Sequence, residues 1–107
     1  MMRVGMISNM KAVELVRNRI VLAENRFAEM VLWHLVRPLP GSGHVFRYRL
    51  AYVVDEICVL RYDNESGKGD HRHWGGRESD YEFVNPEKLL ADFRADIERW
   101  NHENGYS

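Results

Sequence analysis

Runs of β-branched, aromatic and other apolar residues, paired across two-residue polar turns, most constrain the fold of this chain. The first pair is 19–23 and 26–36, separated by Glu24-Asn25. Two such runs joined by so short a turn are typical of a β-hairpin. The first strand extends back to about Ala12, unless residues 11–17 form a short helix instead. Both alternating sets of residues in 26–36 are largely apolar, which predicts a central strand.

A second hairpin is predicted from residues 45–54 and 57–63, which flank Asp55-Glu56. With that turn, Val54 faces Ile57 and the pairs run backward from there. The core face then carries Phe46, Tyr48, Leu50, Tyr52 and Val54 with Ile57 and Val59. The other face carries Arg47, Arg49 and Ala51 with Cys58, Leu60 and Tyr62. We therefore expect two arginines and a tyrosine together on a face that remains available for function.

Residues 80–84 are expected to form a short fifth strand, and a helix follows from Asn85-Pro86. Asparagine is favoured at the N-cap of a helix and proline at its first position. The apolar residues that follow fall on one helical stripe, which predicts that Leu90, Phe93 and Ile97 are buried: Leu89, Leu90, Phe93, Ile97 and Trp100. The predicted fold is α+β, an antiparallel β-meander of four to five strands with a C-terminal helix packed on one face.

Length and composition indicate a single soluble domain. The 107 residues suit one domain over 10–107, with residues 1–9 as an N-terminal extension, and the formal net charge of −1 excludes a global basic field. A nucleic-acid interface would therefore be a local patch. Cys58 is the only cysteine, which excludes an intramolecular disulfide and suits a small buried residue. No apolar run is long enough to span a membrane, so we expect a cytoplasmic protein with no membrane partner.

The segment 62–76, expected to be a loop, carries the densest chemistry. It contains Lys68-Gly69-Asp70-His71-Arg72-His73, in which two histidines lie beside two cations and a carboxylate. Metal-independent RNA cleavage needs a base for the ribose 2′-hydroxyl, an acid for the leaving 5′-oxygen, and cations at the phosphate. We expect His71 and His73 to divide the acid and base work, and Lys68 and Arg72 to stabilise the phosphate. An ordinary polar connecting loop is the alternative.

The residues around this segment complete the predicted site. Those assigned to substrate binding are Arg47, Arg49, Tyr62 and Asp70, and those that could stack on unpaired bases are Tyr62, Trp74 and Tyr81. If the segment is extended, His71 and His73 point to the same side because they are two residues apart. No cofactor is required by this chemistry.

Metal binding is a second chemistry for the same residues. Its ligands would be His71, His73 and Asp70, with His44 or Asp63 as a further ligand. The neighbouring Lys68 and Arg72 would repel a dication, and no recognised ligand spacing is completed. We therefore assign no metal ligand. Of the remaining histidines, His34 is expected on a strand and His102 at the C-terminal end of the helix.

Several of these motifs together resemble the TumE-type toxins of prokaryotic toxin–antitoxin pairs. The resemblance runs from about Met10 to Trp100 and rests on Arg61-Tyr62-Asp63-Asn64, Gly67 to His73, Tyr81-Glu82-Phe83-Val84 and Leu89-Leu90-Ala91-Asp92-Phe93. It implies a small growth-inhibiting toxin that is neutralised by a cognate helix-turn-helix antitoxin. An RNA-cleaving activity is suspected for such toxins.

Two function classes remain open from the sequence. One is a toxin that cleaves RNA, and the other is a non-enzymatic domain that grips a phosphate or a partner protein. The same residues serve a phosphate clamp and a phosphoryl-transfer site, so turnover on RNA is what separates the two classes. A homodimer formed through an edge strand is a further open alternative.

Overall fold

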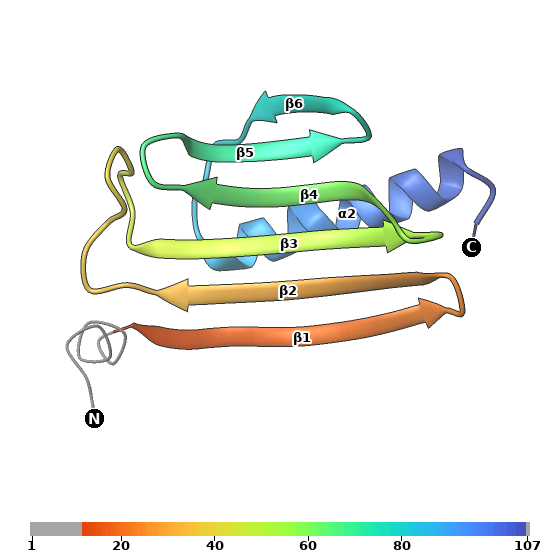
Figure 1. The fold of residues 1–107 in the computed structure, drawn as a ribbon, viewed down its shortest axis with the longest axis horizontal. Coiled ribbons are helices and arrows are strands. Elements are labelled where there is room, and N and C mark those ends of the chain that lie inside the picture. Colours follow the sequence, from red (N-terminus) through yellow and green to blue (C-terminus); the bar gives the residue numbers. More distant parts are fainter. Residues whose placement is uncertain (1–11, 107) are drawn as a thin grey trace.

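The computed structural model describes residues 12–106, in which six strands form one antiparallel sheet followed by a C-terminal helix (Figure 1). The elements are β1 Val13–Ala23, β2 Arg26–His34, β3 Phe46–Val54, β4 Ile57–Glu65, β5 Gly69–Trp74, β6 Arg77–Asp80 and α2 Pro86–Glu103. The strand order β1-β2-β3-β4-β5-β6 is a simple meander with β1 and β6 at its edges. The predicted α+β meander is confirmed, with six strands in place of four or five. The expected extension 1–9 lies outside the described residues.

Both predicted two-residue turns are present. Glu24-Asn25 joins β1 to β2, and Asp55-Glu56 joins β3 to β4. Asp55 and Glu56 have φ angles of 51° and 67°. Two successive left-handed residues give a turn whose twist matches that of the flanking strands. The alternative of a short helix over 11–17 is wrong for its described part, because residues 13–17 belong to β1.

The histidine-bearing segment is a strand, so the prediction of a loop is wrong. β5 pairs with β4 on one side and with β6 on the other. The predicted fifth strand at 80–84 is also misplaced, since β6 covers Arg77–Asp80 and is joined to β5 by Gly75-Gly76. Gly75 has a φ of 61°, which glycine adopts without strain. Every residue of β6 is exposed and polar, so the strand carries no hydrophobic alternation that a sequence pattern could reveal.

A β-bulge changes the predicted faces of β4. Val54 pairs with Ile57 as expected, but the register shifts next to it, so that Tyr52 lies opposite Leu60 and Val59 is the extra residue. An extra residue moves every later side chain of the strand to the other face. Leu60 and Tyr62 are therefore in the core, with 1% and 2% of their surface exposed. The prediction that Tyr62 shares a face with Arg47 and Arg49 is wrong.

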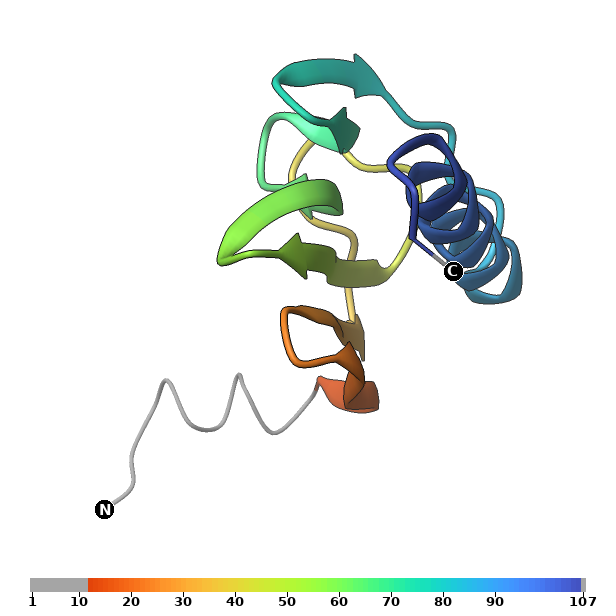
Figure 2. The same ribbon diagram turned by 90° about the vertical axis from the view of Figure 1, so that its right-hand side faces the viewer.

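Helix α2 covers one face of the sheet over β3, β4 and β5 (Figure 2). Asn85 caps it by accepting a hydrogen bond of 2.7 Å from the backbone N–H of Lys88. Leu89 and Phe93 are buried in the core. Leu90 and Ile97 are only half-buried, because they line an apolar groove of about 550 Å³ between α2 and strands β1 and β2.

The burial expected for Cys58 is wrong. Its side chain is exposed next to the turn between β3 and β4. Cys58 pairs with Val53, which places its side chain on the face of the sheet that α2 does not cover.

We predict that Phe93→Ala lowers the free energy of unfolding by about 3–5 kcal/mol, since it empties the space of a fully buried aromatic ring. Urea denaturation followed by circular dichroism measures this change. Val84→Ala is the matched control, because Val84 is an exposed apolar residue just before the helix. A Phe93→Ala protein as stable as Val84→Ala would contradict the described core.

Candidate active site on the open face of the sheet

The side chains of β5 alternate between the two faces of the sheet. The face opposite α2 is called the open face below. His71 pairs with Asp63 and His73 with Arg61, whereas Arg72 pairs with the buried Tyr62. Because directly paired residues share a face, both histidines lie on the open face and Arg72 faces the helix. The prediction that His71 and His73 point to one side is confirmed, because the segment is extended.

Two rows of paired residues cross the open face beside each other. One row runs across the four strands from β3 to β6 through Arg49, Asp63, His71 and Asp80. The second row runs through Ala51, Arg61, His73 and Glu78. Neighbouring side chains in such a row are about 4.5–5.5 Å apart at their Cβ atoms. The meander thus brings residues from four strands into one site.

The two histidines have different surroundings. Nη2 of Arg61 lies 3.0 Å from Nε2 of His73. Arg61 Nε is 3.1 Å from an oxygen of Asp63, an ion pair whose geometry is not that of a hydrogen bond. His71 lies between two carboxylates, with Nδ1 3.6 Å from Glu78 and Nε2 3.8 Å from Asp80. Glu78 also lies 3.7 Å from His73, so a carboxylate of β6 faces both rings.

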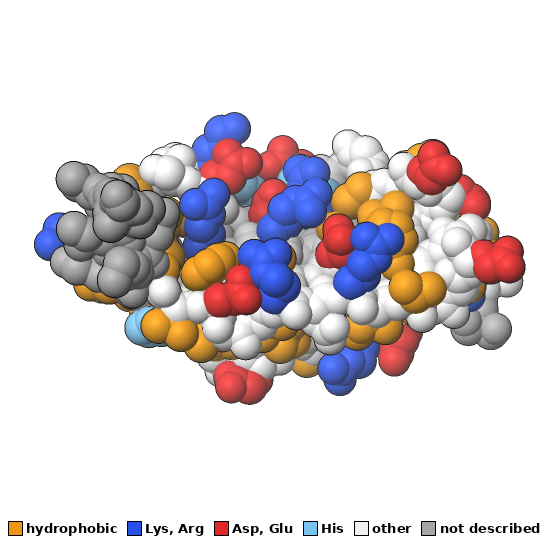
Figure 3. Space-filling view, turned by 60° about the horizontal axis from the view of Figure 1, so that its bottom comes forward, with side chains coloured by type: hydrophobic (Ala, Val, Ile, Leu, Met, Phe, Trp, Pro, Cys, Tyr) orange, Lys and Arg blue, Asp and Glu red, His pale blue; other side chains and the backbone are white. Residues whose placement is uncertain are grey.

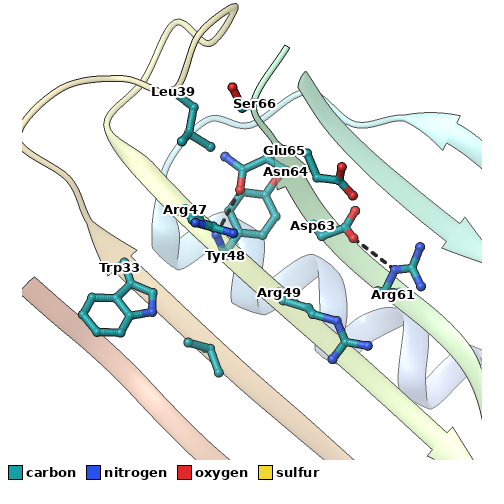
Figure 4. Close-up of a pocket in the computed structure, with 11 residues that line it drawn as sticks. Trp33, Leu39, Arg47, Tyr48, Arg49, Arg61, Asp63, Asn64, Glu65 and Ser66 are labelled. Atoms are coloured by element: carbon teal, nitrogen blue, oxygen red, sulfur yellow. Dashed lines mark hydrogen bonds and ion pairs between the residues drawn. The ribbon is translucent and has the colours of Figure 1, made fainter. Parts of the chain in front are cut away.

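A groove of about 690 Å³ adjoins the histidines on the same face. Figure 4 shows Arg47 and Arg49 rising from β3, Trp33 on β2 beside them, and the Arg61–Asp63 pair on β4. Arg47 and Arg49 are exposed and make no ion pair with any residue in 12–106. Lys and Arg side chains gather over the middle of the sheet, with carboxylates between them (Figure 3). The groove is therefore lined by three arginines and two carboxylates, Asp63 and Glu65, and it runs beside the two imidazoles.

Arg72 contributes to the packing between sheet and helix. Its Nε donates to Asp96 of α2 at 2.6 Å and to the hydroxyl of Tyr62 at 3.1 Å, and that hydroxyl donates to the same carboxylate at 2.6 Å. The hydrogen bond to Asp96 raises the pKa of Arg72 despite its partial burial. Burial, followed by the hydrogen bond to Asp96, raises the pKa of Tyr62. This network joins β4 and β5 to α2.

Asp70 also lies on the helix face. Its carboxylate oxygen Oδ2 accepts a hydrogen bond of 2.6 Å from the hydroxyl of Tyr48. The same oxygen lies 2.8 Å from Nε2 of His44. The backbone N–H of Phe46 donates to Nδ1 of His44, so Nε2 carries the ring proton and donates to Asp70. Burial, then the bond to Asp70, raises the pKa of Tyr48. Asp70 thus fixes the loop before β3 against the start of β5.

The other residues predicted for the site do not converge on it. Lys68 is an exposed turn residue, 3.9 Å from Glu65. The residues expected to stack on bases are all on the helix face: Tyr62 is buried, Trp74 lies under the guanidinium of Arg99, and Tyr81 donates to Asp92. Trp74 faces the helix because side chains alternate along β5, and Tyr62 faces the helix because of the bulge in β4. The structure therefore brings together His71, His73, Arg47 and Arg49, and it separates them from Arg72, Tyr62 and Asp70.

The metal-ligand set considered for the sequence is divided by the sheet. Asp70 faces the helix while His71 and His73 occupy the open face, because consecutive strand residues point to opposite sides. Within residues 12–106, no three side chains of histidine, cysteine, aspartate or glutamate are arranged to hold a metal ion. The carboxylates nearest the histidines are Asp63, Glu78 and Asp80, at 3.6–4.0 Å.

The sequence analysis missed Arg61 and Glu78 in the site and Trp33 in the adjoining groove, and it considered Asp63 only as a metal ligand. Arg61 lies directly before Tyr62, and only a bulge at Val59, which the sequence analysis did not predict, assigns it to the open face. The Gly75-Gly76 turn is the signal that could have brought Glu78 opposite His73. Trp33 reaches the groove only through its pairing with Arg47 across a long loop, for which the sequence holds no signal.

A comparison with protein families supplies the remaining observation. The family model described as Toxin TumE matches residues 9–101, which is most of the chain. The chain belongs to the TumE toxin family. It is thus the toxin component of a toxin–antitoxin system, and the TumE family implies an antitoxin partner. No curated protein and no solved structure matches the chain significantly. Within residues 12–106, no helix has the length and apolar character needed to cross a membrane.

We predict that Arg72→Ala destabilises this TumE-family protein by about 1–3 kcal/mol, because it leaves the carboxylate of Asp96 without its cationic partner. Arg49→Ala is the matched control and should change stability by less than about 0.5 kcal/mol, since Arg49 is exposed and unpaired. Urea unfolding of the two variants beside the wild type measures both changes. Equal stability of the two variants would contradict the division of the arginines between the faces.

Proposed function

We propose that this TumE toxin is a metal-independent endoribonuclease that arrests growth by cleaving RNA on the open face of its sheet. The observation that carries the proposal is the placement of His71 and His73 on one face, with Arg61 directly opposite His73 and Arg49 in the row of His71. Two imidazoles next to guanidinium groups supply the acid, the base and the anion binding that ribose-assisted cleavage requires.

We assign His73 as the general base and His71 as the general acid. A guanidinium can only donate hydrogen bonds, so Arg61 keeps Nε2 of His73 as an acceptor. The single lone pair of that nitrogen becomes free to take the proton of a ribose 2′-hydroxyl when Arg61 turns from His73 to the phosphate of the bound RNA, and the 2′-oxygen then attacks the adjacent phosphorus. Nδ1 of His71 lies 3.6 Å from Glu78 and Nε2 lies 3.8 Å from Asp80, with no guanidinium of residues 12–106 between them, so we assign the proton donor to this ring. His71 gives its proton to the leaving 5′-oxygen as the P–O bond breaks, leaving a 2′,3′-cyclic phosphate and a 5′-hydroxyl.

The phosphate contacts come from arginines on the same face. Arg61 lies directly opposite His73, Arg49 lies in the row of His71 beyond Asp63, and Arg47 extends the positive charge along β3 into the groove. A guanidinium can bind two phosphate oxygens at once and stabilise the charge that builds on them. Lys68 and Arg72 are not given this role, because Lys68 is in the turn before β5 and Arg72 is bound to Asp96.

We predict that His71→Ala and His73→Ala each lower RNA cleavage about 10²–10⁴-fold, the usual contribution of a positioned acid or base. Purified protein is incubated with total RNA, with and without ribosomes, in the presence of EDTA. Activity should persist in the chelator and follow a bell-shaped pH profile, because one histidine acts unprotonated and the other protonated. His102→Ala is the matched control, since His102 is exposed in the last turn of α2.

Three outcomes would replace this proposal. Cleavage that survives both substitutions, in variants with wild-type circular dichroism, would eliminate the histidine mechanism. Dependence on added zinc or manganese would assign the histidines and their neighbouring carboxylates to a metal-dependent hydrolase. No cleavage under any condition would favour a toxin that acts by binding a phosphate or a protein without turnover.

We further predict that the antitoxin is a cognate helix-turn-helix protein that restores growth when co-expressed with the toxin. Family membership motivates this prediction. The measurements are the growth of cells that express both proteins and size-exclusion chromatography of the pair. The His73→Ala protein should form the same complex although it is not toxic, which separates binding from activity. A partner that neither restores growth nor co-elutes with the toxin would contradict the prediction.

A further inference from the structure

Trp33 is a large aromatic side chain of the open face that the proposed chemistry does not use. Trp33 lies on β2, is half-buried, and pairs with Arg47 across the β2–β3 ladder. Helix α2 packs on the opposite face and therefore does not cover this ring. Figure 4 shows its indole lying beside Arg47 at the edge of the groove.

The surroundings of Trp33 suit a flat ring with an attached anion. Val31 and Leu39 give the groove apolar walls next to the indole. Arg47 and Arg49 bring two positive charges without an acidic partner in the described residues. An unpaired nucleobase stacks on an aromatic face, and its phosphates bind to neighbouring arginines. An acidic peptide would use the arginines but would leave the indole face unmatched.

The position of Trp33 relative to the histidines separates two parts of a bound strand. Three strand spacings lie between β2 and β5, which is about 14 Å, and Arg47 is displaced by about 7 Å along β3 from the row of His71. The path between them is continuous along the open face, because Arg47, Arg49, Arg61 and Asp63 all line one groove. A base on Trp33 therefore belongs to a nucleotide away from the cleaved phosphate.

We propose that Trp33 is a base-stacking subsite that binds an unpaired nucleobase of single-stranded RNA, with Arg47 and Arg49 on the phosphates that lead to the histidines. This inference rests on the proposed function and adds to it the substrate class, an unpaired strand rather than a duplex. Stacking tolerates every base, since each has an aromatic face. The subsite thus selects for the absence of secondary structure and not for sequence.

The test measures binding of the uncleaving His73→Ala protein to a fluorescein-labelled single-stranded RNA and to its duplex by anisotropy. A second substitution in this protein, Trp33→Leu, keeps an apolar side chain at position 33 but removes the aromatic face. Single-strand affinity should fall about 5- to 150-fold, the range measured for the loss of one stacked base. Adding Trp33→Phe in its place keeps an aromatic ring and should stay within a few fold of the parent. Duplex affinity should be the same in all three proteins.

A cleavage assay separates failure of this inference from failure of the proposed function. In the wild-type background, Trp33→Leu should lower kcat/KM on a long single strand far more than on a ribodinucleotide, because a dinucleotide on the histidines does not reach Trp33. Unchanged single-strand affinity of Trp33→Leu would overturn the subsite while His71 and His73 remain necessary for cleavage. The subsite would also be overturned if Trp33→Leu lost antitoxin binding but kept its affinity for RNA. It would likewise be overturned if the His73→Ala protein bound no RNA.

Discussion

A single extra residue in β4 decides which side chains reach the open face. Because Val59 is bulged out of the ladder with β3, Leu60 and Tyr62 turn into the core, and Arg61 and Asp63 turn away from it. Because β5 pairs with β4 and β6 pairs with β5, the faces of the β4 side chains determine the faces of the side chains on both later strands. A ladder without the bulge would place His71 and His73 under the helix. The open-face site therefore depends on one local departure from regular pairing.

The helix face fixes β5 in the orientation that the open face requires. Asp70 is held by Tyr48 and His44, and Arg72 is held by Asp96 of α2. These contacts alternate with the two histidines along the strand, so they limit rotation of β5 without touching the site. β6 is short and exposed, and it adds Glu78 and Asp80 beside the rings. Stability and proposed chemistry are thus assigned to alternate residues of one strand.

The sequence predicted the fold well and the site in part, for identifiable physical reasons. Hydrophobic alternation and polar turns located four strands, and Asn85-Pro86 located the start of α2. The spacing of His71 and His73 predicted their common side. A bulge leaves no periodic signal, however, so Tyr62 was placed on the wrong face. Strands β5 and β6 are polar, and their pairing depends on backbone hydrogen bonds and Gly75-Gly76. Trp33 meets Arg47 through tertiary pairing alone.

An alanine scan of residues 70–74, with toxicity and unfolding free energy measured for each variant, tests the two-faced strand most directly. The account predicts alternation: changes at His71 and His73 abolish growth arrest although both variants remain folded. Changes at Asp70, Arg72 and Trp74 lower stability, and growth arrest persists in any variant that remains folded. Loss of growth arrest at Asp70 or Arg72 with unchanged stability, together with full toxicity of the histidine variants, would contradict it.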